Sequence, residues 1–65
     1  MHAIINGEST SITPSTTVTD IISTLKIEGK IAVEINKEIL PRSQFDQYQV
    51  CDGDVLEIVR AIGGG

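Results

Sequence analysis

The sequence predicts a small α+β fold, in which one helix packs across a mixed β-sheet. Three observations support this prediction: the chain has 65 residues, one segment with helical apolar spacing, and several short segments with the apolar pattern of strands. A chain of this length buries only about 60% of the surface that its unfolded form exposes, and two layers use so few residues well. Val, Ile and Leu must supply most of the packing, since Phe45 and Tyr48 are the only aromatic residues.

The chain begins with a predicted β-hairpin. Ala3-Ile4-Ile5 is a short apolar strand, and the following Asn6-Gly7 suits a type I′ turn, in which both central residues need positive φ. The returning strand is expected over residues 8–13, where Ile12 stands among Ser and Thr residues that indicate one exposed face. Pro14 then ends this strand.

The best helix signal follows the hairpin. Four apolar residues stand at i, i+3, i+4 and i+7 and form one stripe: Val18, Ile21, Ile22 and Leu25. Thr17 precedes the stripe as an N-cap, and Asp20 lies three residues further on, where a carboxylate completes a capping box and favours the positive helix end. Gly29 is expected to end the helix.

Two strands joined by a turn are predicted after the helix. Residues 30–35 alternate apolar and other side chains, which indicates a half-buried strand. Asn36-Lys37-Glu38 is typical of a turn, and Ile39-Leu40 forms a short returning strand that Pro41 ends. Ser43 is expected to cap one loose helical turn.

The last strand is predicted at residues 55–59, after a tight turn at Asp52-Gly53-Asp54. It is almost continuously apolar, as is typical of a strand in the middle of a sheet. A hairpin, a crossover helix and a late strand that returns to the middle define a β-grasp (ubiquitin-like) roll, with a mixed sheet of four to five strands. We expect a β-grasp body over residues 1–60 and a flexible glycine-rich tail over residues 61–65.

The last strand also predicts a docking surface. Leu56 and Ile58 are expected to face the helix, so that their neighbours point to the other side of the sheet. Four apolar residues would then form a small patch for a partner protein: Ile4, Val55, Val59 and, at the root of the tail, Ile62.

Composition limits the classes of function. The formal charge of −4 disfavours binding to nucleic acid or to an anionic membrane, because both select basic surfaces. The single cysteine, Cys51, excludes an internal disulfide, and no apolar run is long enough to span a membrane. We therefore expect a cytoplasmic protein that docks on other proteins.

The three residues at the end of the sequence, Gly63, Gly64 and Gly65, have no value for folding, because glycine loses the most backbone entropy on ordering and packs no side chain. Such a tail is able to enter a channel too narrow for other residues, and it extends by about 10 Å. The alternative is a frayed terminus or a cloning remnant.

A terminal glycine carboxylate is a poor electrophile until it is activated. An enzyme that uses ATP is able to convert it to an acyl-adenylate, after which a nucleophile takes the acyl group. A sulfur nucleophile gives a thiocarboxylate, and a lysine amine gives an isopeptide conjugate. Neither route requires a catalytic side chain or a bound cofactor in the carrier.

Several motifs together resemble the ThiS family, the ubiquitin-like sulfur carriers of thiamine biosynthesis. These are the Asn6-Gly7 hairpin, the segment over residues 35–42 with its N-x-x-I-L-P-R pattern, the Asp52-Gly53-Asp54 turn and the diglycine end. The resemblance covers nearly the whole chain. It implies that an E1-like adenylyltransferase of the ThiF type activates Gly65 with ATP, and that a thiocarboxylate forms there. Gly64 belongs to the same end, and Gly63 extends it.

The resemblance also implies the partners. The thiocarboxylate would donate its sulfur to a thiazole synthase of the ThiG type, and the sulfur would come from a donor such as a cysteine desulfurase. Two alternatives remain open: a molybdopterin-type sulfur carrier, and a ubiquitin-like modifier or interaction module. The sequence gives no support for an enzyme, since it holds no paired acid and base, metal cluster or phosphate loop.

Other polar residues favour structural interpretations. Asp52-Gly53-Asp54 lacks the rest of a calcium loop, and His2 has no partner at metal-ligand spacing. Cys51 is expected to be a small, partly buried core residue, because no base is paired with it. For Arg42 and Arg60, contact with an acidic patch of the activating enzyme and plain solvation stay equally open.

Overall fold

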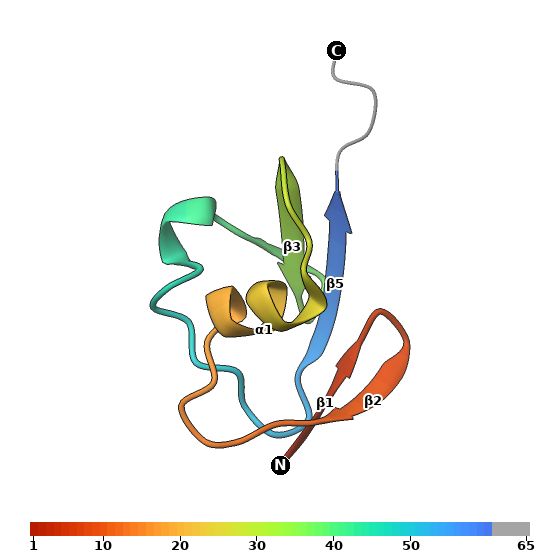
Figure 1. Ribbon diagram of the computed structural model, residues 1–65. Coiled ribbons are helices and arrows are strands. Elements are labelled where there is room, and N and C mark those ends of the chain that lie inside the picture. The colour runs from red at the N-terminus through yellow and green to blue at the C-terminus, as the bar shows by residue number, and fades with distance from the viewer. Residues whose placement is uncertain (61–65) are drawn as a thin grey trace.

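The computed structural model describes residues 1–60, so the predicted tail at residues 61–65 lies outside the described residues. The chain forms five strands, one α-helix and one 3-10 turn, in this order: β1 (His2–Ile5), β2 (Glu8–Ser11), α1 (Val18–Leu25), β3 (Ile31–Ile35), β4 (Glu38–Leu40), η1 (Arg42–Gln44) and β5 (Val55–Arg60). Figure 1 shows α1 crossing one face of the sheet. The predicted α+β class is confirmed.

The sheet has the strand order β2-β1-β5-β3-β4, which places the last strand in the middle, as predicted. β5 pairs in parallel with β1 and antiparallel with β3, and the two hairpins form the outer parts of the sheet (Figure 1). A mixed five-stranded sheet with one crossover helix is the β-grasp roll.

Both hairpins turn on two residues with positive φ. Asn6 and Gly7 have φ of 51° and 85°, as the predicted type I′ turn requires. Asn36 and Lys37 have φ of 51° and 71°, so the second turn is of the same kind although it contains no glycine. Glu38, which we expected in that turn, is already the first residue of β4.

The start of α1 is as predicted, but its end is not. The Asp20 N–H donates to Thr17 Oγ1 at 3.1 Å, and the Thr17 N–H donates to Asp20 Oδ2 at 3.0 Å, which completes the capping box. The helix does not run to Gly29, because Lys26 turns left-handed with φ of 58°. This turn lets the Ile27 N–H bond the Ile22 carbonyl at 3.3 Å and packs Ile27 against the core.

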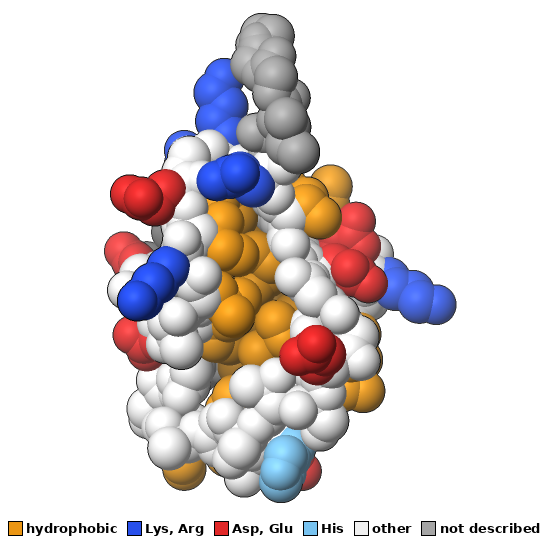
Figure 2. All heavy atoms as spheres, turned by 45° about the vertical axis from the view of Figure 1, so that its right-hand side comes forward, with side chains coloured by type: hydrophobic (Ala, Val, Ile, Leu, Met, Phe, Trp, Pro, Cys, Tyr) orange, Lys and Arg blue, Asp and Glu red, His pale blue; other side chains and the backbone are white. Residues whose placement is uncertain are grey.

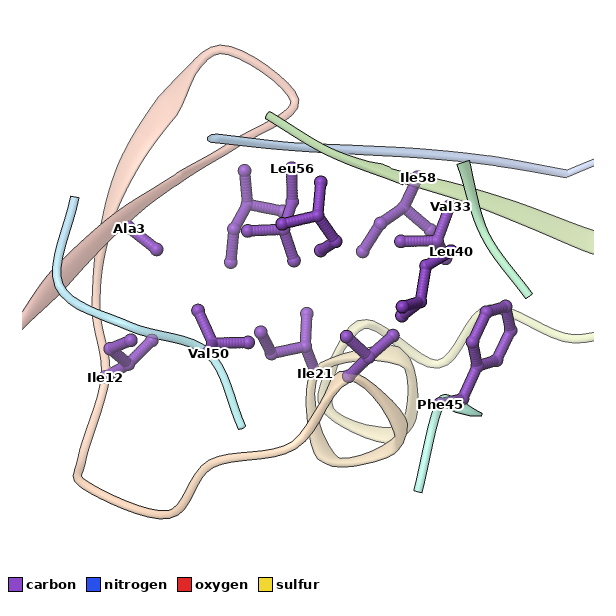
Figure 3. Packing of buried hydrophobic residues seen from close by; sticks show 12 residues of the cluster. Ala3, Ile12, Ile21, Val33, Leu40, Phe45, Val50, Leu56 and Ile58 are labelled. Atoms are coloured by element: carbon purple, nitrogen blue, oxygen red, sulfur yellow. The ribbon is translucent and has the colours of Figure 1, made fainter. Parts of the chain in front are cut away.

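The core lies between the sheet and α1. Leu56, Ile58 and Val33 point from the sheet toward the layer that holds Ile21 and Val50 (Figure 3). Twelve hydrophobic residues form this buried cluster: Ala3, Ile5, Ile12, Val18, Ile21, Val33, Ile35, Leu40, Phe45, Val50, Leu56 and Ile58.

The segment between β4 and β5 differs in detail from the prediction. Its helical turn begins at Arg42 after Pro41, and no side chain caps it, so the expected Ser43 cap is wrong. Pro41 stands at the N-cap with an extended backbone, and its carbonyl accepts from the Gln44 N–H at 2.9 Å, which begins the turn. Phe45 at the end of the turn is buried and closes one end of the core (Figure 3).

Candidate docking face and tail root

The predicted functional end of the chain begins where β5 ends. Gly63, Gly64 and Gly65, and also Ile62 from the predicted patch, lie outside the described residues. What the structure describes is the strand that leads to them, which ends at Arg60, pairs with β1 at its first two residues and pairs with β3 from Leu56 onward. The site is therefore built from the surroundings of β5.

The two faces of β5 are as predicted. Leu56 and Ile58 are 0% and 3% exposed and face α1. Val55 and Val59 are 39% and 56% exposed, since alternate residues of a strand point to opposite faces. The face of the sheet opposite to α1 thus carries apolar side chains in contact with solvent.

This open face extends beyond the predicted residues. Ile4 of β1 is 41% exposed and pairs with Val55 in the register of the sheet, which confirms its predicted place beside that residue. Ile39 of β4 is 77% exposed, and the sequence analysis did not include it in the patch. Since Leu40 points into the core, the alternation of side chains along a strand requires its neighbour Ile39 to point outward. Residues of β3, of the β3–β4 turn, of β4 and of β5 line a shallow groove here: Ala32, Val33, Glu34, Lys37, Ile39, Val55, Glu57 and Val59.

Two turn asparagines hold β5 in place. Asn6 Oδ1 accepts from the Ile58 N–H at 2.8 Å, and Asn6 Nδ2 donates to the Ile58 carbonyl at 3.1 Å, so the side chain continues the β1–β5 ladder by one step. Asn36 Oδ1 accepts from the Val55 N–H at 3.0 Å, and the Asn36 N–H donates to the Val55 carbonyl. The strand that leads to the tail is thereby fixed at its first and fourth residues.

A buried carboxylate anchors the start of β5. Asp54 is 8% exposed and accepts three hydrogen bonds of 2.9 to 3.0 Å, from Asn36 Nδ2, the Tyr48 hydroxyl and the Cys51 N–H. Burial alone would raise the pKa of Asp54, but these three donors outweigh it and hold the pKa below its ordinary value. Burial, together with the hydrogen bond to Asp54, raises the pKa of Tyr48 to about 12. Sequence reasoning found the turn but not this network.

Cys51 is exposed, so the prediction of a partly buried core residue is wrong. Val50, only 2% exposed, takes the core position, and the next side chain of an extended segment must then point outward. The Cys51 thiol donates to the Gln49 carbonyl at 3.7 Å, while its backbone N–H belongs to the Asp54 network.

A second hollow of about 580 Å³ lies between α1 and the β1–β2 hairpin. Figure 2 shows hydrophobic side chains at the bottom of a groove between two mainly polar ridges. Ile5, Ile12 and Ile21 belong to its lining, with Thr and Ser residues around them. Leu25, the last residue of the predicted helix stripe, also lines this hollow and is 46% exposed because the hairpin does not cover it.

Within residues 1–60, no three His, Cys, Asp or Glu side chains are grouped as a metal site would need. The His2 backbone N–H donates to Asp52 Oδ1 at 2.8 Å, which ties the start of the chain to the turn before β5. Among residues 1–60, the structure contains no helix with the length and apolar character needed to cross a membrane.

The chain resembles proteins of one family. The model of the ThiS family matches residues 3–65. A sulfur carrier protein ThiS of Bacillus subtilis is 42% identical over 50 residues, which cover 75% of this chain and 76% of that protein. A crystal structure of a thiamine biosynthesis protein (ThiS) from Geobacter metallireducens superposes with a TM-score of 0.83 at 36% identity, over 100% of both chains.

A longer relative carries a segment like this chain. A thiazole synthase of Paramagnetospirillum magneticum is 47% identical over 66 residues. The match covers 100% of this chain but only 20% of that protein, so the chain spans about a fifth of its length.

Proposed function

Because the chain belongs to the ThiS family, we propose that it is a sulfur carrier of thiamine biosynthesis that works through the carboxylate of Gly65. In this proposal an E1-like adenylyltransferase of the ThiF type activates Gly65, and a thiazole synthase of the ThiG type receives the sulfur. The observation that carries the proposal is the family match through residue 65, which includes the glycine end.

The chemistry needs only the terminal carboxylate of this chain. A carboxylate oxygen of Gly65 attacks the α-phosphorus of ATP, and pyrophosphate leaves. Sulfide then attacks the carbonyl carbon, and AMP leaves. Where the donor is a cysteine desulfurase, its persulfide attacks instead, and a thiol reductant cleaves the S–S bond of the resulting acyl disulfide, so that the thiocarboxylate is released and the reductant is oxidised to a disulfide. The product is a thiocarboxylate in which one oxygen has been replaced by one sulfur. The chain is a co-substrate in these steps, and ATP is bound by the activating enzyme.

The body of the protein contributes position. An adenylating enzyme must place the carboxylate close to the α-phosphate, and misplacement by about 1 Å is able to cost a hundredfold in rate. β5 pairs with β1 at Val55 and Leu56 and with β3 from Leu56 to Arg60, and the Asn6 side chain bonds Ile58, so the backbone is held up to the point where the tail begins. The open sheet face around Ile4, Val55 and Val59 is the proposed docking surface, and Ile62 would extend it toward the tail.

The match to a thiazole synthase supports the choice of acceptor. In the Paramagnetospirillum magneticum protein, a segment that resembles this chain is part of a protein named for that activity. A carrier segment joined to its acceptor would deliver sulfur without diffusing. By the same logic, we propose that this chain delivers sulfur to a thiazole synthase that is a separate protein.

Intact-mass measurement tests the proposal. The chain is incubated with ATP, a sulfide source and a purified ThiF-type adenylyltransferase, and reactions without ATP serve as controls. We expect a mass change equal to one oxygen replaced by one sulfur, located at Gly65 by fragmentation. Attachment of the chain to lysine amines instead would favour the protein-conjugating alternative, and an unchanged mass would contradict the proposal.

A further inference from the structure

The hollow between α1 and the β1–β2 hairpin lies beside an outermost strand of the sheet. Among residues 1–60, β2 stands at one end of the strand order and pairs with β1 alone (Figure 1). Glu8, Thr10 and Ser11 of this strand line the hollow, and residues of α1 line it on the other side. At the opposite edge of the sheet, Leu40 of β4 is buried. At β2, by contrast, a strand edge and a hollow lie together.

The backbone of β2 points hydrogen-bonding groups toward this edge. Along an antiparallel pair, residues that exchange hydrogen bonds with the partner strand alternate with residues whose N–H and C=O point away from it. The Ile12 N–H donates to the Met1 carbonyl at 2.8 Å, which places Ile12 in the first set. Thr10, two residues earlier, joins it, so Ser9 and Ser11 belong to the second set. Their N–H and C=O groups face the edge of the sheet, where an added strand would bond them.

The side chains around the hollow define what it accepts. Isoleucine and leucine side chains belong to its lining, and hydrophobic side chains form the bottom of the groove in Figure 2. Leu25 of α1 is the most exposed of them, because neither Glu8 nor Thr10 of β2 reaches across to cover it. The charged residues of the lining, Glu8 and Asp20, are both acidic. The hollow therefore accepts apolar side chains and favours a positive charge beside them.

We propose that β2 and the hollow beside it bind an extended segment of a partner protein as an added strand of the sheet. Every second side chain of this segment is apolar and enters the hollow, and a lysine or arginine at its end faces Glu8 or Asp20. In this binding mode main-chain hydrogen bonds give affinity, and alternate side chains give specificity. The proposal goes beyond the proposed function, because the hollow lies on the helix side of the sheet and Val59 is exposed on the other side.

Other occupants use only part of the site. The sequence of β2 is Glu-Ser-Thr-Ser, so the same strand of a second copy would bring no apolar side chain to the hollow, and its glutamate would approach Asp20. A helix bonds its own backbone groups and would leave those of β2 unused. An extended segment with alternating apolar residues uses both the strand edge and the hollow.

The test is an NMR titration of the full chain with a synthetic peptide in which valine alternates with threonine and a lysine stands at each end. We expect the amide signals of β2 and of the last turn of α1 to shift. The N–H groups of Ser9 and Ser11 should also become protected from hydrogen exchange. A peptide with serine in place of valine is the control for the apolar side chains and should not bind. Absence of binding by the valine peptide would overturn the proposal.

Methylation of the peptide backbone separates strand addition from apolar contact alone. One peptide carries N-methyl groups at its valines, and another carries them at its threonines. In an added strand one of these two sets of N–H groups faces β2 and the other faces solvent, so we expect only one of the two peptides to lose binding. The peptide that loses binding also reveals whether the added strand is parallel or antiparallel to β2. Equal behaviour of the two peptides would contradict strand addition.

Variants of the chain locate the binding. Leu25→Lys should raise the Kd of the valine peptide about tenfold, because it removes apolar contact and places a positive charge beside the lysines of the peptide. Lysine suits the last turn of a helix, so the fold should be kept, which circular dichroism verifies. Ile39→Lys is the matched control: it makes the same change of charge at an exposed apolar residue on the opposite face, and its Kd should stay within about twofold. Equal effects of the two variants would mean that net charge governs binding, and the hollow would not be the site.

A chain that ends at Arg60 tests whether the residues after β5 occupy the site themselves. If the N–H groups of Ser9 and Ser11 are protected in the full chain and lose this protection in the shortened chain, the end of the chain is the occupant and the inference is wrong. If these groups exchange freely in both chains until the peptide is added, the site is open to a partner, as proposed.

Discussion

At the scale of single residues, Asp54 is the least exchangeable polar side chain that the structure describes. It is buried, and its two oxygens are divided among three donors: Oδ1 accepts from Asn36, while Oδ2 accepts from Tyr48 and Cys51. Asn36 has no freedom to turn its amide around, because its own Oδ1 accepts from the Val55 N–H. The network therefore requires an acceptor at both oxygens of residue 54.

Asp54→Asn should lower the free energy of unfolding by about 2 kcal/mol, because its new amide NH₂ would face the Asn36 NH₂ or displace another donor. Asp52→Asn is the control, since Asp52 is exposed and accepts only the His2 N–H. Urea unfolding at neutral pH measures both. Equal effects of the two changes would show that the Asp54 network does not stabilise the fold.

Tyr48 predicts a loss of stability in alkali. Its folded pKa is raised from 10.0 to about 12, so between these values the unfolded chain has lost the phenol proton while the folded chain keeps it. Unfolding then releases a proton, and stability falls as the pH rises through this range. The lowered pKa of Asp54 has the opposite sign: its contribution is present above pH 3.8 and is lost as the pH falls through the folded value.

Thermal unfolding followed over pH checks both signs. Tyr48→Phe should remove the decline between about pH 10 and 12. It should also weaken the acid limb, because it removes one of the three donors that hold the Asp54 pKa down, and its stability at neutral pH should be lower than that of the parent. If Tyr48→Phe lost stability in alkali as the parent does, the alkaline loss of stability would arise from groups other than Tyr48.

At the scale of elements, the sequence predicted those features that depend on local pattern. The period of the apolar residues identified α1 and β3, and Asn6-Gly7 identified the first turn. The predicted end of α1 was wrong, because the chain turns left-handed at Lys26 and packs Ile27 against the core, a tertiary contact that local spacing does not contain.

Thr17→Ala should destabilise the protein by about 1 kcal/mol, because it leaves the Asp20 N–H at the start of α1 without its acceptor. Ser23→Ala is the matched control: Ser23 is exposed within the same helix, and alanine there should be neutral or slightly stabilising. Comparison of unfolding midpoints in denaturant checks the difference. A Thr17 variant as stable as the Ser23 variant would mean that packing alone holds the helix.

The two faces of β5 predict opposite consequences of substitution. Val59→Glu should leave stability nearly unchanged and weaken binding to the activating enzyme, because Val59 is exposed on the docking face. Leu56→Ala should lower the free energy of unfolding by about 2–5 kcal/mol, because Leu56 is fully buried. Calorimetric titration and denaturant unfolding separate the two effects. Unchanged affinity in Val59→Glu would remove this face from the docking surface.

At the scale of the whole molecule, the candidate site was only partly predictable. Ile4, Val55 and Val59 followed from strand alternation once the sheet order was known. The outward orientation of Ile39 could have been found from its alternation with Leu40, but the places of Ile39 and Glu34 relative to β5 depend on the register between strands, which the sequence does not specify. Register arises from long-range pairing, so the position of Glu34 opposite Glu57 on the open face of the sheet appears only in the folded chain.

Because the proposed function places the reaction at the carboxylate of Gly65, it makes the length of the chain end the property on which activation depends most. Deleting Gly65, or adding one residue after it, should abolish activation while leaving stability unchanged. One residue moves the carboxylate by about 3.5 Å, far beyond the tolerance of a near-attack arrangement. An added residue other than glycine would also bring a side chain to a channel shaped for glycine.

Cys51→Ser is the matched control for these tail variants. It should be activated like the parent, because the sulfur is carried on the terminal carbonyl and the exposed thiol of Cys51 is not required. Intact mass after reaction with ATP, sulfide and the adenylyltransferase compares all variants, and circular dichroism verifies that each is folded. Only chains that end at Gly65 should exchange one oxygen for one sulfur. Sulfur uptake by the shortened chain, or its loss in Cys51→Ser, would mean that the carboxylate of Gly65 is not the group that carries sulfur.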